Sequence, residues 1–210
     1  MIRLFGKIFS APAVSTAGAD FVSDTAAPSA HLLAQLEGLN RSPYLQLADS
    51  GLGILSVFDD LKYDRADADL MSPAMRRFAV TQVQPLGFRQ VSGSVLEQDG
   101  SGARIVIPKL HSLGASPFDI TRYTPKRAAD FYLLTPTQTV CRYIDCYPLE
   151  KALDRALGLV RKHPINLYRL MDYLERKPTH SAFRSVLGDI KKAQREAVES
   201  EPLCRRKALG

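Results

Sequence analysis

The chain has 210 residues and a mass of 23.2 kDa, and its 28 Lys and Arg residues outnumber its 22 Asp and Glu residues, which gives a net charge of +6. Hydrophobic residues make up 45% and charged residues 24%, which is typical of globular proteins and excludes collagen, disulfide scaffolds and fully disordered chains. No uncharged run approaches the roughly 18 residues of a membrane-spanning helix, so we expect no transmembrane segment.

The three cysteines, Cys141, Cys146 and Cys204, are too sparse for a disulfide framework. We therefore expect free thiols in a reducing compartment and a cytoplasmic location. Cys141 and Cys146 are not spaced as a redox motif, and no second pair follows at the spacing of a zinc site. The sequence predicts no metal and no cofactor.

Residues 1–30 predict a disordered leader. The first nine residues place Arg3 and Lys7 among bulky apolar side chains, but Gly6 and Lys7 interrupt the apolar run that a secretory signal requires. Residues 10–30 are mostly small or polar and contain no Lys or Arg. Such a segment cannot bury enough apolar surface to offset the entropy of ordering the chain.

An α+β domain is predicted over residues 31–147. The leucines within residues 32–36 lie at helical spacing, and the apolar run over 53–58 is typical of a strand. Ser72 followed by Pro73 is a typical N-cap and first residue of a further helix.

Antiparallel β-hairpins are expected in the second half of this domain. The strands of the first are predicted at 88–97 and 103–108, joined by the turn signal Asp99-Gly100. A second hairpin is predicted from the β-prone runs 131–134 and 139–144.

The hydrophobic period becomes helical in residues 148–200, which we expect to pack on or follow the α+β domain. Three amphipathic stripes predict three helices, over 149–160, 167–174 and 183–197. A basic tail occupies 201–210. The predicted fold class is therefore α+β, with antiparallel hairpins and flanking helices followed by a basic three-helix C-terminal region.

The positive charge is unevenly distributed along the chain. Residues 1–150 hold 14 Lys and Arg against 15 Asp and Glu, whereas residues 151–210 hold 14 against 7. Such asymmetry favours a polyanionic partner, such as nucleic acid or an anionic lipid surface. The alternative is a helical region whose basic outer face is only solvated.

The candidate nucleic-acid-binding residues lie on the third predicted helix, away from its apolar stripe, and in the tail. Their contacts would be with phosphates, sensitive to salt and indifferent to sequence. These residues are Arg184, Lys191, Lys192, Arg195, Arg205, Arg206 and Lys207.

No phosphate loop, dinucleotide fingerprint, nucleophile elbow or zincin motif occurs in the sequence, and no catalytic residue is predicted. Metal-dependent nucleases of the restriction type need an acid followed by an acid-x-lysine motif. Asp119 could supply the first acid, but Asp130 has no lysine two residues later and Lys109 has no acid two residues earlier. His111, Asp119 and Asp130 are candidate catalytic residues only if the protein is an enzyme of unfamiliar layout.

The sequence favours a non-enzymatic bacterial accessory or regulatory protein that contacts nucleic acid through its basic C-terminal helices. The first alternative is a protein-interaction factor, either a secreted effector or a plasmid- or phage-borne inhibitor of a transfer or secretion system. The second is a degenerate or unfamiliar metal-dependent nuclease. The sequence does not indicate an oligomeric state.

Overall fold

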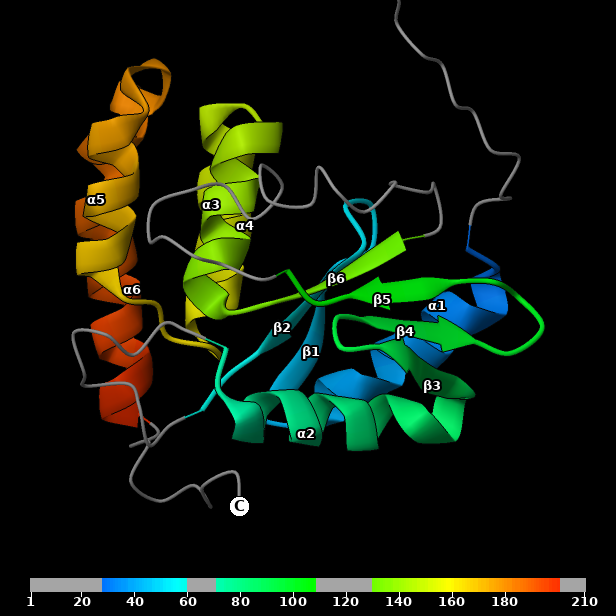
Figure 1. Ribbon diagram of the computed structural model, residues 1–210. Coiled ribbons are helices and arrows are strands. Elements are labelled where there is room, and N and C mark those ends of the chain that lie inside the picture. Colours follow the sequence, from blue (N-terminus) through cyan, green and yellow to red (C-terminus); the bar gives the residue numbers. More distant parts are fainter. Residues whose placement is uncertain (1–27, 60–70, 109–129, 201–210) are drawn as a thin grey trace, which may run out of the picture.

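A six-stranded sheet separates two groups of helices in the computed structural model, which describes residues 28–59, 71–108 and 130–200 (Figure 1). The strands follow the order β1-β2-β6-β5-β4-β3 across the sheet. Their bounds are β1 Leu45–Asp49, β2 Ile54–Val57, β3 Phe88–Ser92, β4 Val95–Gln98, β5 Arg104–Val106 and β6 Asp130–Leu134. The α+β prediction is confirmed.

The sheet is mixed, however, and not built from antiparallel hairpins alone. β6 lies between β2 and β5 and runs parallel to both, whereas the other neighbouring strands are antiparallel. A central parallel strand needs long crossover connections, which hydrophobic patterns do not predict. β2 and β6 are buried along their whole length because helices cover both faces of the sheet.

One face of the sheet packs against the helices α1 (Ala30–Glu37) and α2 (Pro73–Val83). Both helices fulfil the sequence prediction. Ser72 caps α2 by accepting a hydrogen bond from the Met75 amide at 3.1 Å, and Pro73 is its first residue. The buried residues of this core include Leu36, Leu55 and Phe131.

The other face is covered by a layer of four helices, which we call the C-terminal layer (residues 135–200). Its helices are α3 Pro136–Cys146, α4 Leu149–Val160, α5 Leu167–Arg176 and α6 Leu187–Ser200, and the 3-10 helix η5, Pro178–Val186, joins the last two. α4 packs against both α3 and α6. A second core, which includes Leu134, Tyr143 and Tyr173, joins this layer to the sheet. The three predicted helices α4, α5 and α6 are confirmed (Figure 1).

The predicted strand 139–144 is wrong, because these residues belong to helix α3. Thr135 and Gln138 form a capping box: each side chain accepts a hydrogen bond from the other residue's amide, and Pro136 is the first helical residue. These start signals outweigh the strand propensity of Thr139, Val140 and the residues after them.

Two other differences concern the sheet. The single strand expected over 88–97 is two strands, β3 and β4, which turn back on each other at Gly93. β1 was not predicted at all. The turn at Asp99-Gly100 does join β4 to β5 as expected, with Gly100 at a φ of +83°. In the described ranges, no helix is long and apolar enough to cross a membrane.

Candidate functional site

The cations predicted to bind nucleic acid face solvent wherever the structure describes them. Arg184, Lys191, Lys192 and Arg195 are exposed, whereas the apolar stripe of the same segment, with Phe183 and Ile190, is buried. Arg184 donates a hydrogen bond to the Leu174 carbonyl at 3.0 Å, at the end of α5, so part of its donor capacity caps that helix. Arg205, Arg206 and Lys207 lie outside the described residues, as do residues 1–27 of the predicted leader and the whole predicted tail. The last residues of the predicted leader are ordered, since Ser29 caps α1 and Ala30 begins it.

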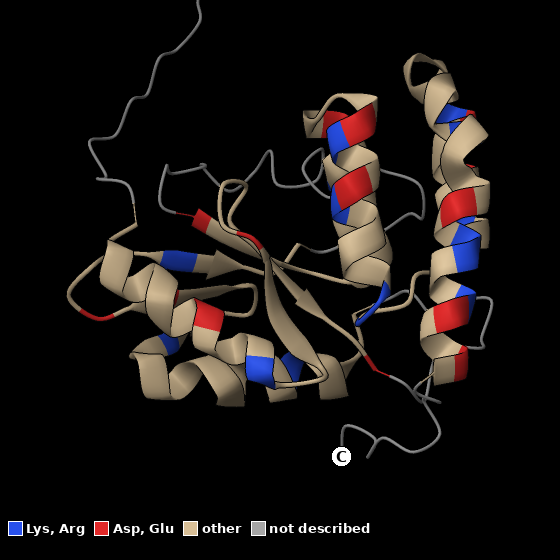
Figure 2. Cartoon of the chain, turned by 180° about the vertical axis from the view of Figure 1, so that it is seen from behind, with Lys and Arg blue, Asp and Glu red and all other residues tan. Residues whose placement is uncertain are grey.

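The helices α4, α5 and α6 of the C-terminal layer each hold equal numbers of cations and acids. α4 and α5 each hold two cations and two acids, and α6 holds three of each. Figure 2 shows the two signs interleaved along these helices. Lys192 and Glu196, for example, approach to 4.0 Å on α6. A helix with balanced charge attracts a polyanion only weakly at long range.

In the described part of the C-terminal layer, the excess of cations over acids lies in the connectors between helices. The α4–α5 connector carries Arg161 and Lys162 and no acidic residue, and η5 carries Arg184 and no acidic residue. Arg161 is exposed and makes no hydrogen bond or ion pair within the described residues. The connectors, more than the helix faces, are therefore the basic part of the layer.

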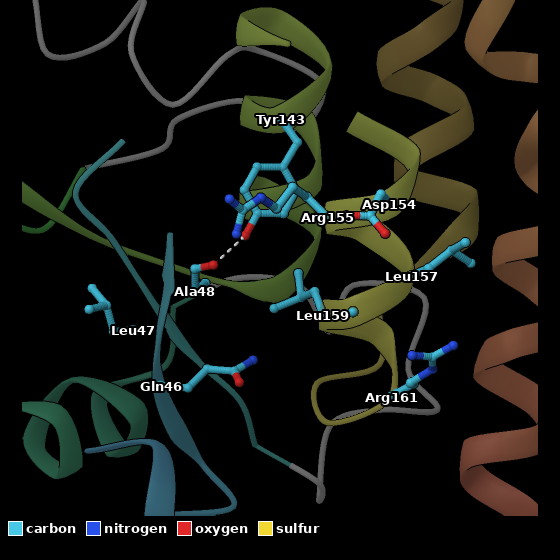
Figure 3. Close-up of a pocket in the computed structure, with 10 residues that line it drawn as sticks. Gln46, Leu47, Ala48, Tyr143, Asp154, Arg155, Leu157, Leu159 and Arg161 are labelled. Atoms are coloured by element: carbon cyan, nitrogen blue, oxygen red, sulfur yellow. Dashed lines mark hydrogen bonds between the residues drawn. The ribbon is translucent and has the colours of Figure 1, made fainter. Parts of the chain in front are cut away.

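A cavity of about 270 Å³ lies where the outer strand β1 meets helix α4 (Figure 3). Strand β1 contributes Gln46, Leu47 and Ala48, and the C-terminal layer contributes the remaining lining residues. These are Tyr143, Asp154, Arg155, Leu157, Gly158, Leu159 and Arg161. The cavity therefore spans the seam between the sheet and the C-terminal layer.

Asp49, at the end of β1, is held beside this cavity by hydrogen bonds and an ion pair. Its carboxylate accepts hydrogen bonds from the Tyr147 hydroxyl and the Leu52 amide, both at 2.9 Å. The nearest Arg155 atom, Nε, lies 3.7 Å from the carboxylate, beyond hydrogen-bonding distance. Burial and the hydrogen bond to Asp49 raise the pKa of Tyr147 to about 12.

Gln46 is the buried polar side chain of the cavity. The residue is only 7% exposed, and its amide makes no hydrogen bond within the part of the chain that the structure describes. Figure 3 shows the amide directed from β1 toward α4. The amide atoms themselves keep some contact with solvent at the cavity, so they are available to a polar ligand there.

Asp130, one of the acids considered for an enzyme, is held in a buried ion pair. Arg104 donates two hydrogen bonds to its two carboxylate oxygens, at 2.8 and 2.7 Å. The hydrogen bond to Asp130 raises the pKa of Arg104. A carboxylate held by an arginine on both oxygens serves structure. His111 and Asp119 lie outside the described residues.

A cluster that sequence reasoning missed surrounds Asp145 at the end of α3. Its Oδ1 accepts from the Tyr173 hydroxyl, and it lies 3.2 Å from both Lys177 Nζ and His180 Nε2. The rings of Tyr173 and His180 are stacked, with an angle of 16° between their planes. Tyr173, Lys177 and His180 occupy helical spacing in the sequence, but nothing in it pairs them with Asp145, which lies 28 to 35 positions earlier. The cluster fastens α5 and η5 to α3.

No protein family model, no curated protein and no solved structure matches the chain.

Proposed function

We propose that this chain is a non-enzymatic accessory or regulatory protein that contacts nucleic acid through cations of its C-terminal layer. The observation that carries the proposal is Arg161 in the α4–α5 connector, which is exposed and makes no hydrogen bond or ion pair within the described residues. The cations of α6 flank this connector as a second, charge-balanced set.

The separation of charge between the two halves of the molecule supports this location. In the described part of the C-terminal layer 12 cations stand against 8 acids, whereas residues 28–59, 71–108 and 130 hold 5 cations and 6 acids. A polyanion is therefore attracted to the layer and not to the opposite side of the sheet. Contacts of this kind position a protein on phosphates without reading sequence.

Fluorescence anisotropy of a short labelled duplex, titrated with the full chain at about 50 mM salt, tests the proposal. The double variant Arg161→Gln/Lys162→Gln should weaken binding most, and Lys191→Gln/Lys192→Gln/Arg195→Gln should weaken it less. The matched control is Arg41→Gln/Arg77→Gln/Arg89→Gln, because these three exposed cations lie on the other half of the molecule.

The control should bind the duplex with the affinity of the wild type. The proposal is contradicted if the wild type shows no binding at this salt concentration, or if the control loses as much affinity as the connector variant. All of the altered side chains are exposed, so the variants should fold, and circular dichroism checks the folding of each one.

A protein partner is the second candidate function, and one observation favours it. Tyr168 is 77% exposed and Met171 46% exposed, one turn apart on the outer side of α5. Tyrosine and methionine are enriched at protein interfaces. A partner that stays bound to the wild type after nuclease treatment, but not to Tyr168→Ser/Met171→Ser, would support this function. Loss of the partner on nuclease treatment would contradict it.

A further inference from the structure

We infer that the cavity between β1 and α4 binds a phosphoryl group, supplied by a free nucleotide or by a nucleic-acid backbone. The proposed function concerns cations on the outer surface, whereas this inference concerns a recess with its own polar lining. The inference depends on the proposed function only if the phosphoryl group comes from a nucleic-acid backbone.

The first argument is the Gln46 amide. It lies in a residue that is more than nine-tenths buried, makes no hydrogen bond within the described residues and is directed toward α4 across the cavity. A phosphoryl oxygen in the cavity would accept a hydrogen bond from this amide in place of solvent.

The second argument is the pair of arginines in the lining. Arg155 extends from α4 toward Tyr143 and Ala48 on the β1 side of the cavity (Figure 3). Its side chain is 46% exposed, and its 3.7 Å approach to Asp49 leaves the guanidinium donors available. The planar fork of arginine matches the oxygens of a phosphoryl group and binds them through two hydrogen bonds.

Arg161 lines the same cavity one and a half turns farther along the chain. In Figure 3 its side chain extends away from Gln46, toward α6. Because no partner within the described residues holds it there, rotation of its flexible side chain could bring it over the mouth of the cavity. We therefore assign Gln46 and Arg155 as the direct ligands and Arg161 as a cation at the rim.

The charge of the lining favours an anion over a cation. Two arginines line the cavity against one acid, Asp154, and the Asp49 carboxylate, which pairs with Arg155 at 3.7 Å, offsets part of this positive charge. The Asp49 carboxylate beside the cavity is buried and already accepts two hydrogen bonds, so it offers little to a cationic ligand. A volume of about 270 Å³ is slightly below the ~300 Å³ at which sites for drug-sized ligands begin, which suits a phosphoryl group with part of a sugar.

Isothermal titration calorimetry of the full chain with inorganic pyrophosphate tests the inference. Arg155→Gln and Gln46→Met should each weaken binding by about tenfold or more, the effect of losing a charge-assisted or buried hydrogen bond. The matched control, Lys192→Gln, removes the same charge outside the cavity and should leave the affinity unchanged. Since Gln46→Met alters a buried residue, the exposed Arg161→Gln provides a further variant, with a smaller loss expected.

Absence of pyrophosphate binding to the wild type would overturn the inference, and so would an equal loss in Lys192→Gln. Competition between pyrophosphate and a labelled duplex distinguishes the two sources. Displacement of the duplex indicates that a backbone phosphate enters the cavity, and simultaneous binding indicates a free phosphoryl ligand. Duplex binding without pyrophosphate binding refutes only the inference that the cavity binds a phosphoryl group. Pyrophosphate binding without duplex binding refutes only the proposed function.

Discussion

Ser56 on β2 and His163 in the α4–α5 connector are hydrogen bonded to each other, with Oγ and Nδ1 2.8 Å apart. The other ring nitrogen, Nε2, lies 3.2 Å from the carbonyl oxygen of Pro43, which can only accept a hydrogen bond. Nε2 therefore carries the proton, and Nδ1 accepts from the Ser56 hydroxyl. Both residues are completely buried, so this contact fixes the connector that carries Arg161 against the sheet.

Replacement of Ser56 by Ala removes the donor to a buried imidazole nitrogen. The free energy of unfolding should fall by about 1–3 kcal/mol, the cost of depriving a buried polar group of its partner. Urea denaturation measures the change. Ser185→Ala is the control, because Ser185 is exposed and its hydrogen bond to the Ala182 carbonyl is local. Equal losses in the two variants would contradict the assigned role of Ser56.

Removing only one partner of the buried Arg104–Asp130 ion pair should strongly lower the stability of the protein. Asp130→Asn leaves a buried guanidinium without its carboxylate, and we expect a loss of about 3–5 kcal/mol in thermal or urea unfolding. Arg89 and Asp99 form an ion pair that is mostly exposed. Arg89→Gln should therefore cost less than about 1 kcal/mol. A stable, fully folded Asp130→Asn variant would show that the pair is not structural.

Gly53 lies where a side chain cannot be accommodated, next to β6. Its φ is +62°, and a Cβ atom would lie 2.6 Å from the backbone oxygen of Asp130. Gly53→Ala should lower the free energy of unfolding by more than about 1–2 kcal/mol, because strain from the left-handed backbone adds to the clash. Gly188→Ala on α6 should instead stabilise the protein by about 0.5–1 kcal/mol, since its Cβ would meet open space. The opposite signs are the result to check by calorimetry.

The raised pKa of Tyr147 predicts that the protein loses stability at alkaline pH. Its pKa is raised to about 12 by burial and by the hydrogen bond to Asp49, whereas an unfolded tyrosine ionises near pH 10. The stabilisation is thus fully present below pH 10 and is lost as the pH rises from about 10 to about 12, because only the unfolded chain has released its proton.

Tyr147→Phe should therefore make the stability less dependent on pH within this window. Urea denaturation at several alkaline pH values measures the dependence, and Tyr168→Phe, at an exposed position, is the control. Burial also raises the pKa of Tyr143, which will add to the alkaline loss in both variants. An unchanged slope in Tyr147→Phe would contradict the role of Asp49.

The sequence predicted elements whose hydrophobic pattern is local and failed where tertiary partners decide. The stripes of α4, α5 and α6 were readable because each of these helices buries one face. β1 was missed because it has only five residues and its alternation of apolar and polar side chains is confined to Leu45-Gln46-Leu47. Helix α3 could have been predicted from the start signals Thr135, Pro136 and Gln138.

The cavity and the Asp145 cluster could not have been found from the sequence. Gln46 and Arg155 are 109 positions apart, and only the packing of α4 beside β1 makes them neighbours of one cavity. The excess charge was located correctly in the C-terminal region, but its concentration in the connectors became visible only when the helix bounds were known.

The salt dependence of nucleic-acid binding tests the central claim most directly. The logarithm of duplex affinity, plotted against the logarithm of salt concentration, should fall linearly with a slope of about 0.9 per phosphate contacted. Arg161→Gln/Lys162→Gln should make this slope shallower by up to about 1.8, the share of two contacts. An unchanged slope in this variant, or an affinity that does not respond to salt, would contradict the account.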